Sequence, residues 1–143
     1  MKKTIQLLAI ILATLITSCD NVYINGDLDG MWKLQKVEEE GIDDAIYPED
    51  IYYSYQRNLT FISIMNENDD PIRYLGNMYY NKEENTVTIN GFTLFPHENH
   101  IADIDDLKKF MLYDLETVFT IEELDNRILI MRNDKRRYTF MKW

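Results

Sequence analysis

From residue 30 onward, the sequence alternates between short apolar segments and clusters of turn residues. The apolar segments are rich in β-branched and aromatic residues, which favour strands, and the Asn, Asp, Gly and Pro residues between them favour turns. Eight short segments of this kind predict an all-β antiparallel domain, either a barrel or a sandwich. The predicted strands are 30–38, 51–65 (one bent strand or two), 72–80, 86–89, 92–95, 116–124, 127–132 and 138–143.

Two local patterns refine this picture. Asn90-Gly91 lies between apolar segments and predicts a tight hairpin turn, because both residues tolerate the positive φ angles of a type I′ turn. The segment 103–113 carries Ile104, Leu107 and Met111 at helical spacing, with Asp103 at the capping position. We therefore expect one short helix near 103–113.

The first residues have a different pattern. Lys2 and Lys3 precede an apolar run that is too short to span a bilayer, which needs about 20 apolar residues. This arrangement predicts a secretory signal peptide at 1–18. Its end, Ile16-Thr17-Ser18-Cys19, resembles a bacterial lipobox, in which the peptide is cut before a cysteine that carries a diacylglycerol. An ordinary cleavage site followed by a cysteine is the alternative.

Acylation of Cys19 would hold the chain at a membrane without a spanning helix, since each buried methylene contributes about 0.8 kcal/mol. We expect a lipoprotein of the bacterial cell envelope, in the outer membrane, facing the periplasm or the cell surface. Asp20 follows the cysteine. It is compatible with retention at the inner membrane or with surface export, depending on the source. Residues 19–29 form a polar tether, and 30–143 form the folded domain.

Charge and composition exclude several classes of function. The chain has 15 basic and 25 acidic residues, and removal of 1–18 leaves a formal charge of -12. Nucleic acid is therefore not an expected partner, because phosphates must be met by Lys and Arg. His97 and His100 lie in an acid-rich segment that we interpret as a solvated loop, so we predict no metal site. No catalytic or cofactor-binding motif is present, and we expect no enzyme activity and no cofactor.

Gly30-Met31-Trp32 at the head of the first predicted strand resembles the Gly-x-Trp signature of lipocalins. The segments Tyr52-Tyr53-Ser54-Tyr55-Gln56, Phe119-Thr120-Ile121-Glu122, Ile128-Leu129-Ile130 and Tyr138-Thr139-Phe140-Met141-Lys142 resemble those of lipocalin-like lipoproteins of Bacteroidetes. The resemblance implies a small up-and-down β-barrel of about eight strands. It also implies that Trp32 closes one end of the barrel under a basic residue from a late strand, Arg132 or Arg137.

The resemblance further implies a hydrophobic or amphipathic ligand in the barrel. Strict alternation would place Tyr53, Tyr55, Arg57 and Phe61 on one face, where a basic group among aromatics would suit a carboxylate-headed ligand. We take these four as the candidate ligand-binding residues. The alternative is a self-filled barrel that docks a protein partner, because the last strands are apolar on both faces.

Overall fold

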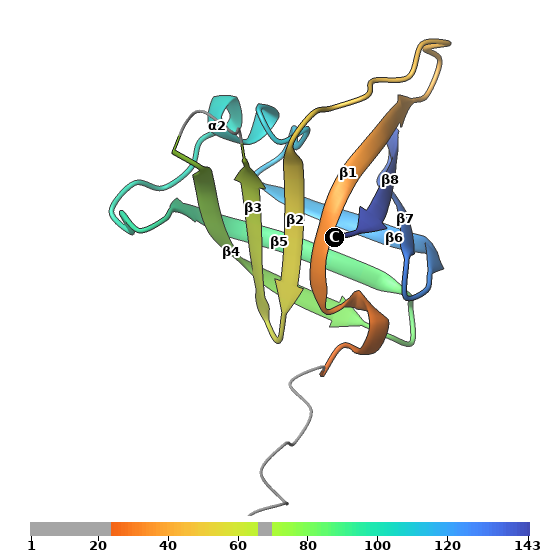
Figure 1. Cartoon of the computed structure of the whole chain (residues 1–143), viewed down its shortest axis with the longest axis horizontal. Coiled ribbons are helices and arrows are strands. Elements are labelled where there is room, and N and C mark those ends of the chain that lie inside the picture. The colour runs from red at the N-terminus through yellow and green to blue at the C-terminus, as the bar shows by residue number, and fades with distance from the viewer. Residues whose placement is uncertain (1–23, 66–69) are drawn as a thin grey trace, which may run out of the picture.

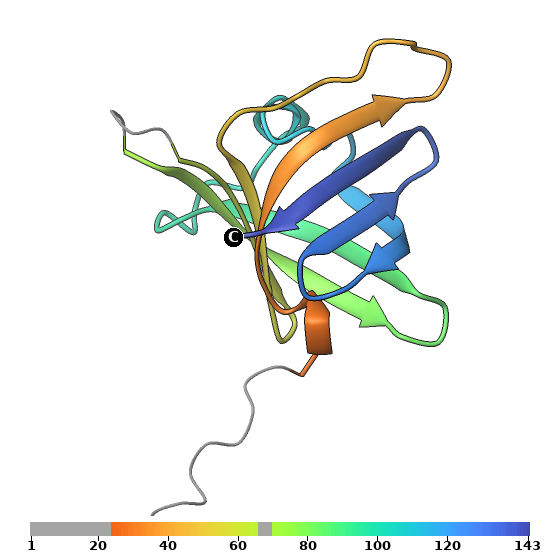
Figure 2. The same ribbon diagram turned by 45° about the vertical axis from the view of Figure 1, so that its right-hand side comes forward.

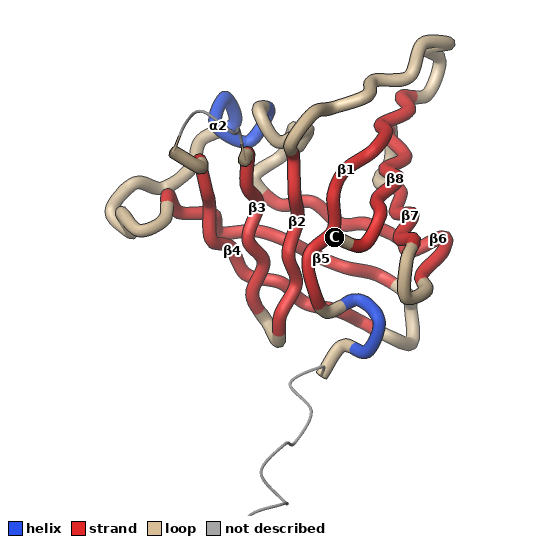
Figure 3. Tube along the Cα trace, viewed as in Figure 1, coloured by secondary structure: helices blue, strands red, loops and turns tan. Residues whose placement is uncertain are grey.

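In the computed structural model, which describes residues 24–65 and 70–143, eight antiparallel strands close into a barrel (Figures 1 and 3). Each strand pairs with the next along the chain, and β1 pairs with β8 to complete the ring. The strands are β1 (Gly30–Glu39), β2 (Ile51–Gln56), β3 (Leu59–Ile64), β4 (Ile72–Asn81), β5 (Thr86–Leu94), β6 (Glu116–Leu124), β7 (Ile128–Arg132) and β8 (Arg136–Lys142). The predicted fold class, an all-β up-and-down barrel, is confirmed.

The segment predicted as one strand or two, 51–65, consists of two strands. Arg57 and Asn58 form the turn between β2 and β3, and Arg57 has a φ of 56°. Gln56 therefore pairs with Leu59, and Tyr55 pairs with Thr60. Because directly opposite residues of an antiparallel pair share a face, Tyr55 and Thr60 point to the same side of the sheet.

The predicted hairpin turn at Asn90-Gly91 is wrong. These residues lie inside β5, which runs through both predicted segments as one strand. Asn90 pairs with Asn77 and Thr93 pairs with Leu75, so the strand carries an extra residue at this point. Gly91 takes a φ of 65°, which suits a β-bulge as well as a turn. The chain stays extended here because β4 pairs with β5 on both sides of this point, while β6 pairs with it up to Asn90.

The barrel encloses the hydrophobic core, and both of its ends are covered (Figure 2). A short 3-10 helix, η1 (Gly26–Leu28), lies at the end where the described chain begins, which we call the base. The helix α2 (Ile104–Lys108) covers the opposite end, the mouth. The largest fully buried side chains are Trp32, Tyr53, Tyr55, Tyr138, Phe110, Phe119 and Phe140.

The helix predicted near 103–113 is present but shorter, and Asp103 is its N-cap as expected. The predicted signal peptide, 1–18, and Cys19 lie outside the described residues. Among the residues described, no helix has the length and apolar character needed to cross a membrane. The strand β1 begins at residue 30, the predicted start of the folded domain, and Leu28 of η1, within the predicted tether, is already buried in the core.

Candidate ligand site

A lid formed by residues 102–114 closes the mouth of the barrel. Its helix begins with a capping box: the Asp103 side chain accepts from the Asp106 backbone N–H, and the Asp106 side chain accepts from the Asp103 N–H. This reciprocal arrangement satisfies two of the donors that a helix start leaves free. Leu107 of the helix, and Phe110 and Leu112 beyond it, are fully buried against the core. The lid is therefore an apolar plug in the barrel mouth.

Two tyrosine hydroxyls from the barrel wall hold the lid backbone. The Tyr53 hydroxyl donates to the Phe110 carbonyl at 2.6 Å, and the Tyr138 hydroxyl donates to the Met111 carbonyl at 2.8 Å. Met111 has a φ of 65°, which turns the chain between these two bonds. Burial raises the pKa of Tyr53 and of Tyr138 well above the ordinary value, so both hydroxyls keep their protons.

The outer side of the lid is fastened by Asp106. Its carboxylate lies 3.0 Å from His100 Nε2 and 3.2 Å from Lys109 Nζ. The hydrogen bond with His100 is the main reason that the pKa of Asp106 falls to about 2, with Lys109 and Tyr74 adding to it. Burial, with the nearby Asp106, raises the pKa of Tyr74 to about 12. Asp106 is therefore charged throughout the neutral range.

Three hydroxyl groups inside the barrel have no hydrogen-bond partner among the described residues. They belong to Tyr55, Thr60 and Thr117, and all three side chains are buried. An unpaired buried polar group costs about 1–3 kcal/mol, so such groups call for an explanation in a native structure. Tyr55 and Thr60 are direct cross-strand partners, which places two of these residues side by side on the inner wall.

The structure separates the four predicted ligand-binding residues. Tyr53 and Tyr55 line the interior, whereas Phe61 is on the outer wall, where it packs edge-to-face on Phe95 at 5.5 Å. Arg57 is exposed in the turn at the base. The prediction of one shared face is wrong because the two-residue turn pairs odd with even positions, so Thr60 and Ile62 face inward instead. The predicted pairing of a basic group with interior aromatic side chains is therefore not formed by Arg57.

At the base, Trp32 is fully buried and donates its indole N–H to the Leu28 carbonyl at 2.8 Å. The cation above its ring is Lys142, whose Nζ lies 4.1 Å from the ring centroid and donates to the Asp27 carbonyl. The prediction that Arg132 takes this position is wrong. Trp32 pairs in register with Lys142, whereas Arg132 lies at the far end of β7.

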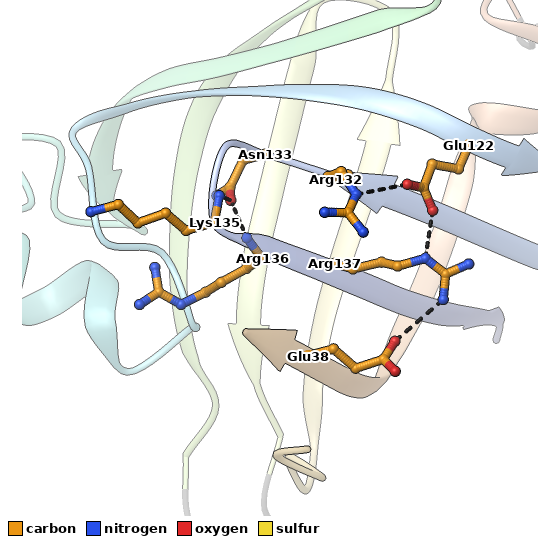
Figure 4. A network of polar contacts seen from close by, with 7 residues as sticks. All are labelled: Glu38, Glu122, Arg132, Asn133, Lys135, Arg136 and Arg137. Atoms are coloured by element: carbon orange, nitrogen blue, oxygen red, sulfur yellow. Dashed lines mark hydrogen bonds and ion pairs between the residues drawn. The ribbon is translucent and has the colours of Figure 1, made fainter. Parts of the chain in front are cut away.

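Arg132 instead belongs to an ion-pair network on the outer wall (Figure 4). Glu122 accepts from Arg132 and from Arg137, and Arg137 also contacts Glu38. The network links β1, β6, β7 and β8 around the closing seam of the barrel. Arg137, the other basic residue expected above the Trp32 ring, therefore also belongs to this network and not to the base.

Arg136, which precedes Arg137 in the sequence, connects the barrel to the lid. It makes two hydrogen bonds with Glu39, of 2.9 and 3.2 Å, and stacks on the Tyr113 ring at 3.7 Å. Figure 4 shows Lys135 and Arg136 extending to the same side, away from Arg137. A groove of about 510 Å³ lies beside them, lined in part by Tyr113, Thr117 and Asn133. The groove is polar and lies at the edge of the lid.

Within residues 24–65 and 70–143, no group of three or more His, Cys, Asp or Glu side chains is arranged to hold a metal ion. His100 contacts Asp106 of the lid. Sequence reasoning missed the inserted Phe110, the base cation Lys142 and the inward threonines. The position of Phe110, three residues after Leu107, is a signal that could have indicated its burial on the same helical face, whereas Lys142 reaches Trp32 only through the register of β1 against β8. The threonines carry no such signal, because a lone Thr fits either face of a strand.

Comparisons with known proteins agree with this architecture. A family model described as a lipocalin-like domain matches residues 14–143. A lipocalin-like protein from Bacteroides uniformis has a similar structure, with a TM-score of 0.66 and 18% identity over 82% of this chain and 100% of that one. An uncharacterized protein from Bacteroides eggerthii superposes with a TM-score of 0.65 and 18% identity, over 81% and 99% of the two chains. No curated protein matches the sequence. The family match and the closed eight-stranded barrel together identify this chain as a member of the lipocalin-like domain family.

Proposed function

We propose that this chain is a lipid-anchored protein of the bacterial cell envelope that binds a small amphipathic molecule in its barrel and catalyses no reaction. The observation that carries the binding role is the lid. Phe110 fills the mouth of the barrel, while the hydroxyls of Tyr55, Thr60 and Thr117 lie inside without a hydrogen-bond partner among the described residues. A ligand that replaces the lid side chains could pair its polar group with these hydroxyls.

The lid sets a lower limit on the size of the ligand. Burial of Leu107, Phe110 and Leu112 stabilises the closed state by about 2 kcal/mol each, or about 6 kcal/mol together. The two tyrosine–carbonyl hydrogen bonds add about 1 kcal/mol each. An alkyl chain gains about 0.8 kcal/mol per buried methylene, so about ten methylenes offset the opening of the lid. The proposal therefore favours a long-chain amphipathic ligand.

Binding is tested on the full chain carrying Cys19→Ser, so that no attached acyl chain competes. Titration with palmitic acid, followed by calorimetry and native mass spectrometry, is expected to show one site. Phe110→Ala, which removes the plug, should bind palmitic acid more tightly. Leu115→Ala, an exposed neighbour of the lid, should leave the affinity unchanged. Butyric acid should bind to none of these proteins, because its chain is too short to offset lid opening. Absence of palmitic acid binding by both the parent and Phe110→Ala would refute the ligand-binding role.

A second candidate function is a docking module with a self-filled barrel. It is favoured by the burial of the interior aromatics, including Trp32 and Phe140, which leaves their side chains no contact with solvent. It is also favoured by two exposed apolar side chains on the outer wall, Met141 and Trp143, which are 52% and 67% exposed. Cross-linking in intact cells tests this role. A partner captured by the parent chain and lost with Trp143→Ser would support it.

The membrane anchor is tested separately. Cells grown with a clickable palmitate analogue should label the parent chain, and Cys19→Ser should abolish the label. Fractionation should place the labelled protein in the outer membrane. Protease treatment of whole cells then distinguishes a surface position from a periplasmic one. Label retained by Cys19→Ser, or a parent chain found without lipid, would contradict the proposed anchor.

A further inference from the structure

The first described residues are fastened to the base of the barrel. Lys82 Nζ donates to the Ile24 carbonyl at 3.1 Å, and the Asn25 side chain donates to the Arg57 carbonyl at 2.8 Å. Asn25 also makes two hydrogen bonds with the Asp29 carboxylate. The chain is thus held between the β2–β3 turn and the β4–β5 turn. These contacts fix Ile24 at a defined position at the base of the barrel.

An exposed aromatic and aliphatic surface surrounds this position. Ile24 is 60% exposed and Tyr79 is 67% exposed, and Leu59 on the neighbouring strand is 39% exposed. Leu59 pairs with Asn77, so Tyr79 is its diagonal neighbour on the same outer face. A shallow groove of about 410 Å³ runs between Ile24, Arg57 and Tyr79. We call Ile24, Leu59 and Tyr79 the base patch.

The length of chain before Ile24 limits where the base patch can lie. If Cys19 carries the acyl chains, as proposed above, residues 19–23 can span at most about 17 Å when fully extended. A ten-residue strand such as β1 is about 33 Å long, or about 25 Å along the axis of a barrel with tilted strands. The anchor is therefore too short to reach around to the lid. The base patch is held next to the membrane surface.

The chemistry of the base patch fits a lipid surface. Tyrosine rings are favoured at the boundary between headgroups and acyl chains, and Lys and Arg extend their charged ends to the phosphates. Arg57 and Lys82 flank the patch. Glu83 and Glu84 follow Lys82 in the β4–β5 turn, so the base has no excess of positive charge. Insertion of apolar side chains, rather than attraction to anionic lipids, is the interaction that these residues support.

We propose that the base patch rests on the membrane, with Tyr79 at the headgroup level, and that the lid points away from the bilayer into the surrounding compartment. This orientation depends on the acylation of Cys19 proposed above. In this orientation the lipid bilayer not only holds the acyl chains of Cys19 but also binds the folded domain directly. The orientation also gives a ligand access to the lid from the aqueous side.

Hydroxyl-radical labelling of the acylated full chain in phosphatidylcholine vesicles tests this orientation. Tyr79 should be labelled about fivefold less in vesicles than in the Cys19→Ser chain free in solution, because a 67% exposed ring becomes covered. Tyr47, which is 71% exposed in the β1–β2 loop, is the matched control and should be labelled equally in both samples. The protection of Tyr79 should persist at high salt, since it does not depend on charge.

A variant pair makes the test specific to the base patch. Tyr79→Asp should restore the labelling of Leu59 in vesicles, whereas Tyr47→Asp should leave Leu59 protected. Vesicle flotation is measured on every sample. An acylated chain that floats with vesicles, but in which Tyr79, like Tyr47, is labelled equally in vesicles and in solution, overturns the orientation alone. A chain that does not float overturns the anchor and the orientation together. Tyr79 protection that appears without vesicles and grows with protein concentration also overturns it, in favour of a second copy of this chain.

Discussion

Two tyrosines on β2 provide a matched test of how the interior is built. Tyr53 and Tyr55 are both fully buried and face the core. The hydroxyl of Tyr53 holds the lid through the Phe110 carbonyl, whereas the hydroxyl of Tyr55 has no partner among the described residues. The same substitution, Tyr to Phe, therefore removes a hydrogen bond at one position and an unpaired polar group at the other.

The structure gives the expected magnitudes. Tyr53→Phe keeps the ring contact with Phe140, at 5.1 Å between centroids, but leaves the Phe110 carbonyl buried and unpaired. This should lower the free energy of unfolding by about 1–3 kcal/mol. Tyr55→Phe should leave the stability unchanged or raise it by up to about 1 kcal/mol, because a desolvated hydroxyl is removed. In a domain of this size, each kcal/mol shifts the unfolding temperature by about 3–6 °C.

Urea unfolding of the two variants and the parent, at one pH and temperature, measures both effects. Hydrogen exchange of the lid amides adds a local readout, and Tyr53→Phe should speed exchange in 102–114 by about tenfold, in proportion to the lost stability. Tyr55→Phe should leave lid exchange unchanged. If Tyr55→Phe destabilises the chain as much as Tyr53→Phe, the reasoning is refuted, because the Tyr55 hydroxyl must then be engaged in an interior polar network.

Three further predictions follow from single contacts. Gly76→Ala would place a Cβ 2.6 Å from the Phe92 ring, so we expect a loss of about 1–3 kcal/mol in thermal unfolding. The folded pKa of Asp106 is about 2 and its ordinary value is 3.8, so its carboxylate stabilises the lid above about pH 4. This stability should be lost as the pH falls towards 2. Hydrogen exchange of the lid amides, followed through an acid titration, should show this loss in the parent and not in Asp106→Asn. Arg136→Ala should cost about 1–3 kcal/mol because its side chain is 13% exposed and its partner is left unpaired. Arg132→Ala, at 47% exposure, should cost less than about 1 kcal/mol, and equal losses would contradict this ranking.

The count of eight strands was predicted correctly from the sequence, because the wrong division at Asn90-Gly91 was offset by the segment 51–65, for which one strand or two was predicted. The segment 51–65 is two strands, and the two segments joined by Asn90-Gly91 are one. A Gly with positive φ serves a turn and a bulge equally well, and the choice between them depends on which strands lie alongside. Here β4 pairs with β5 on both sides of the bulge and β6 pairs with Thr86–Asn90, and together they keep the strand extended.

The sequence by itself determined the fold class, the helix cap at Asp103 and the burial of Trp32, because alternation, capping and a family motif are all local. The tertiary structure alone decided what surrounds these residues. It placed Lys142 rather than Arg132 over the Trp32 ring, through the register of β1 against β8. It also inserted Phe110 into the mouth. Register and lid docking depend on contacts between residues far apart in the chain, and no periodicity within a single segment encodes them.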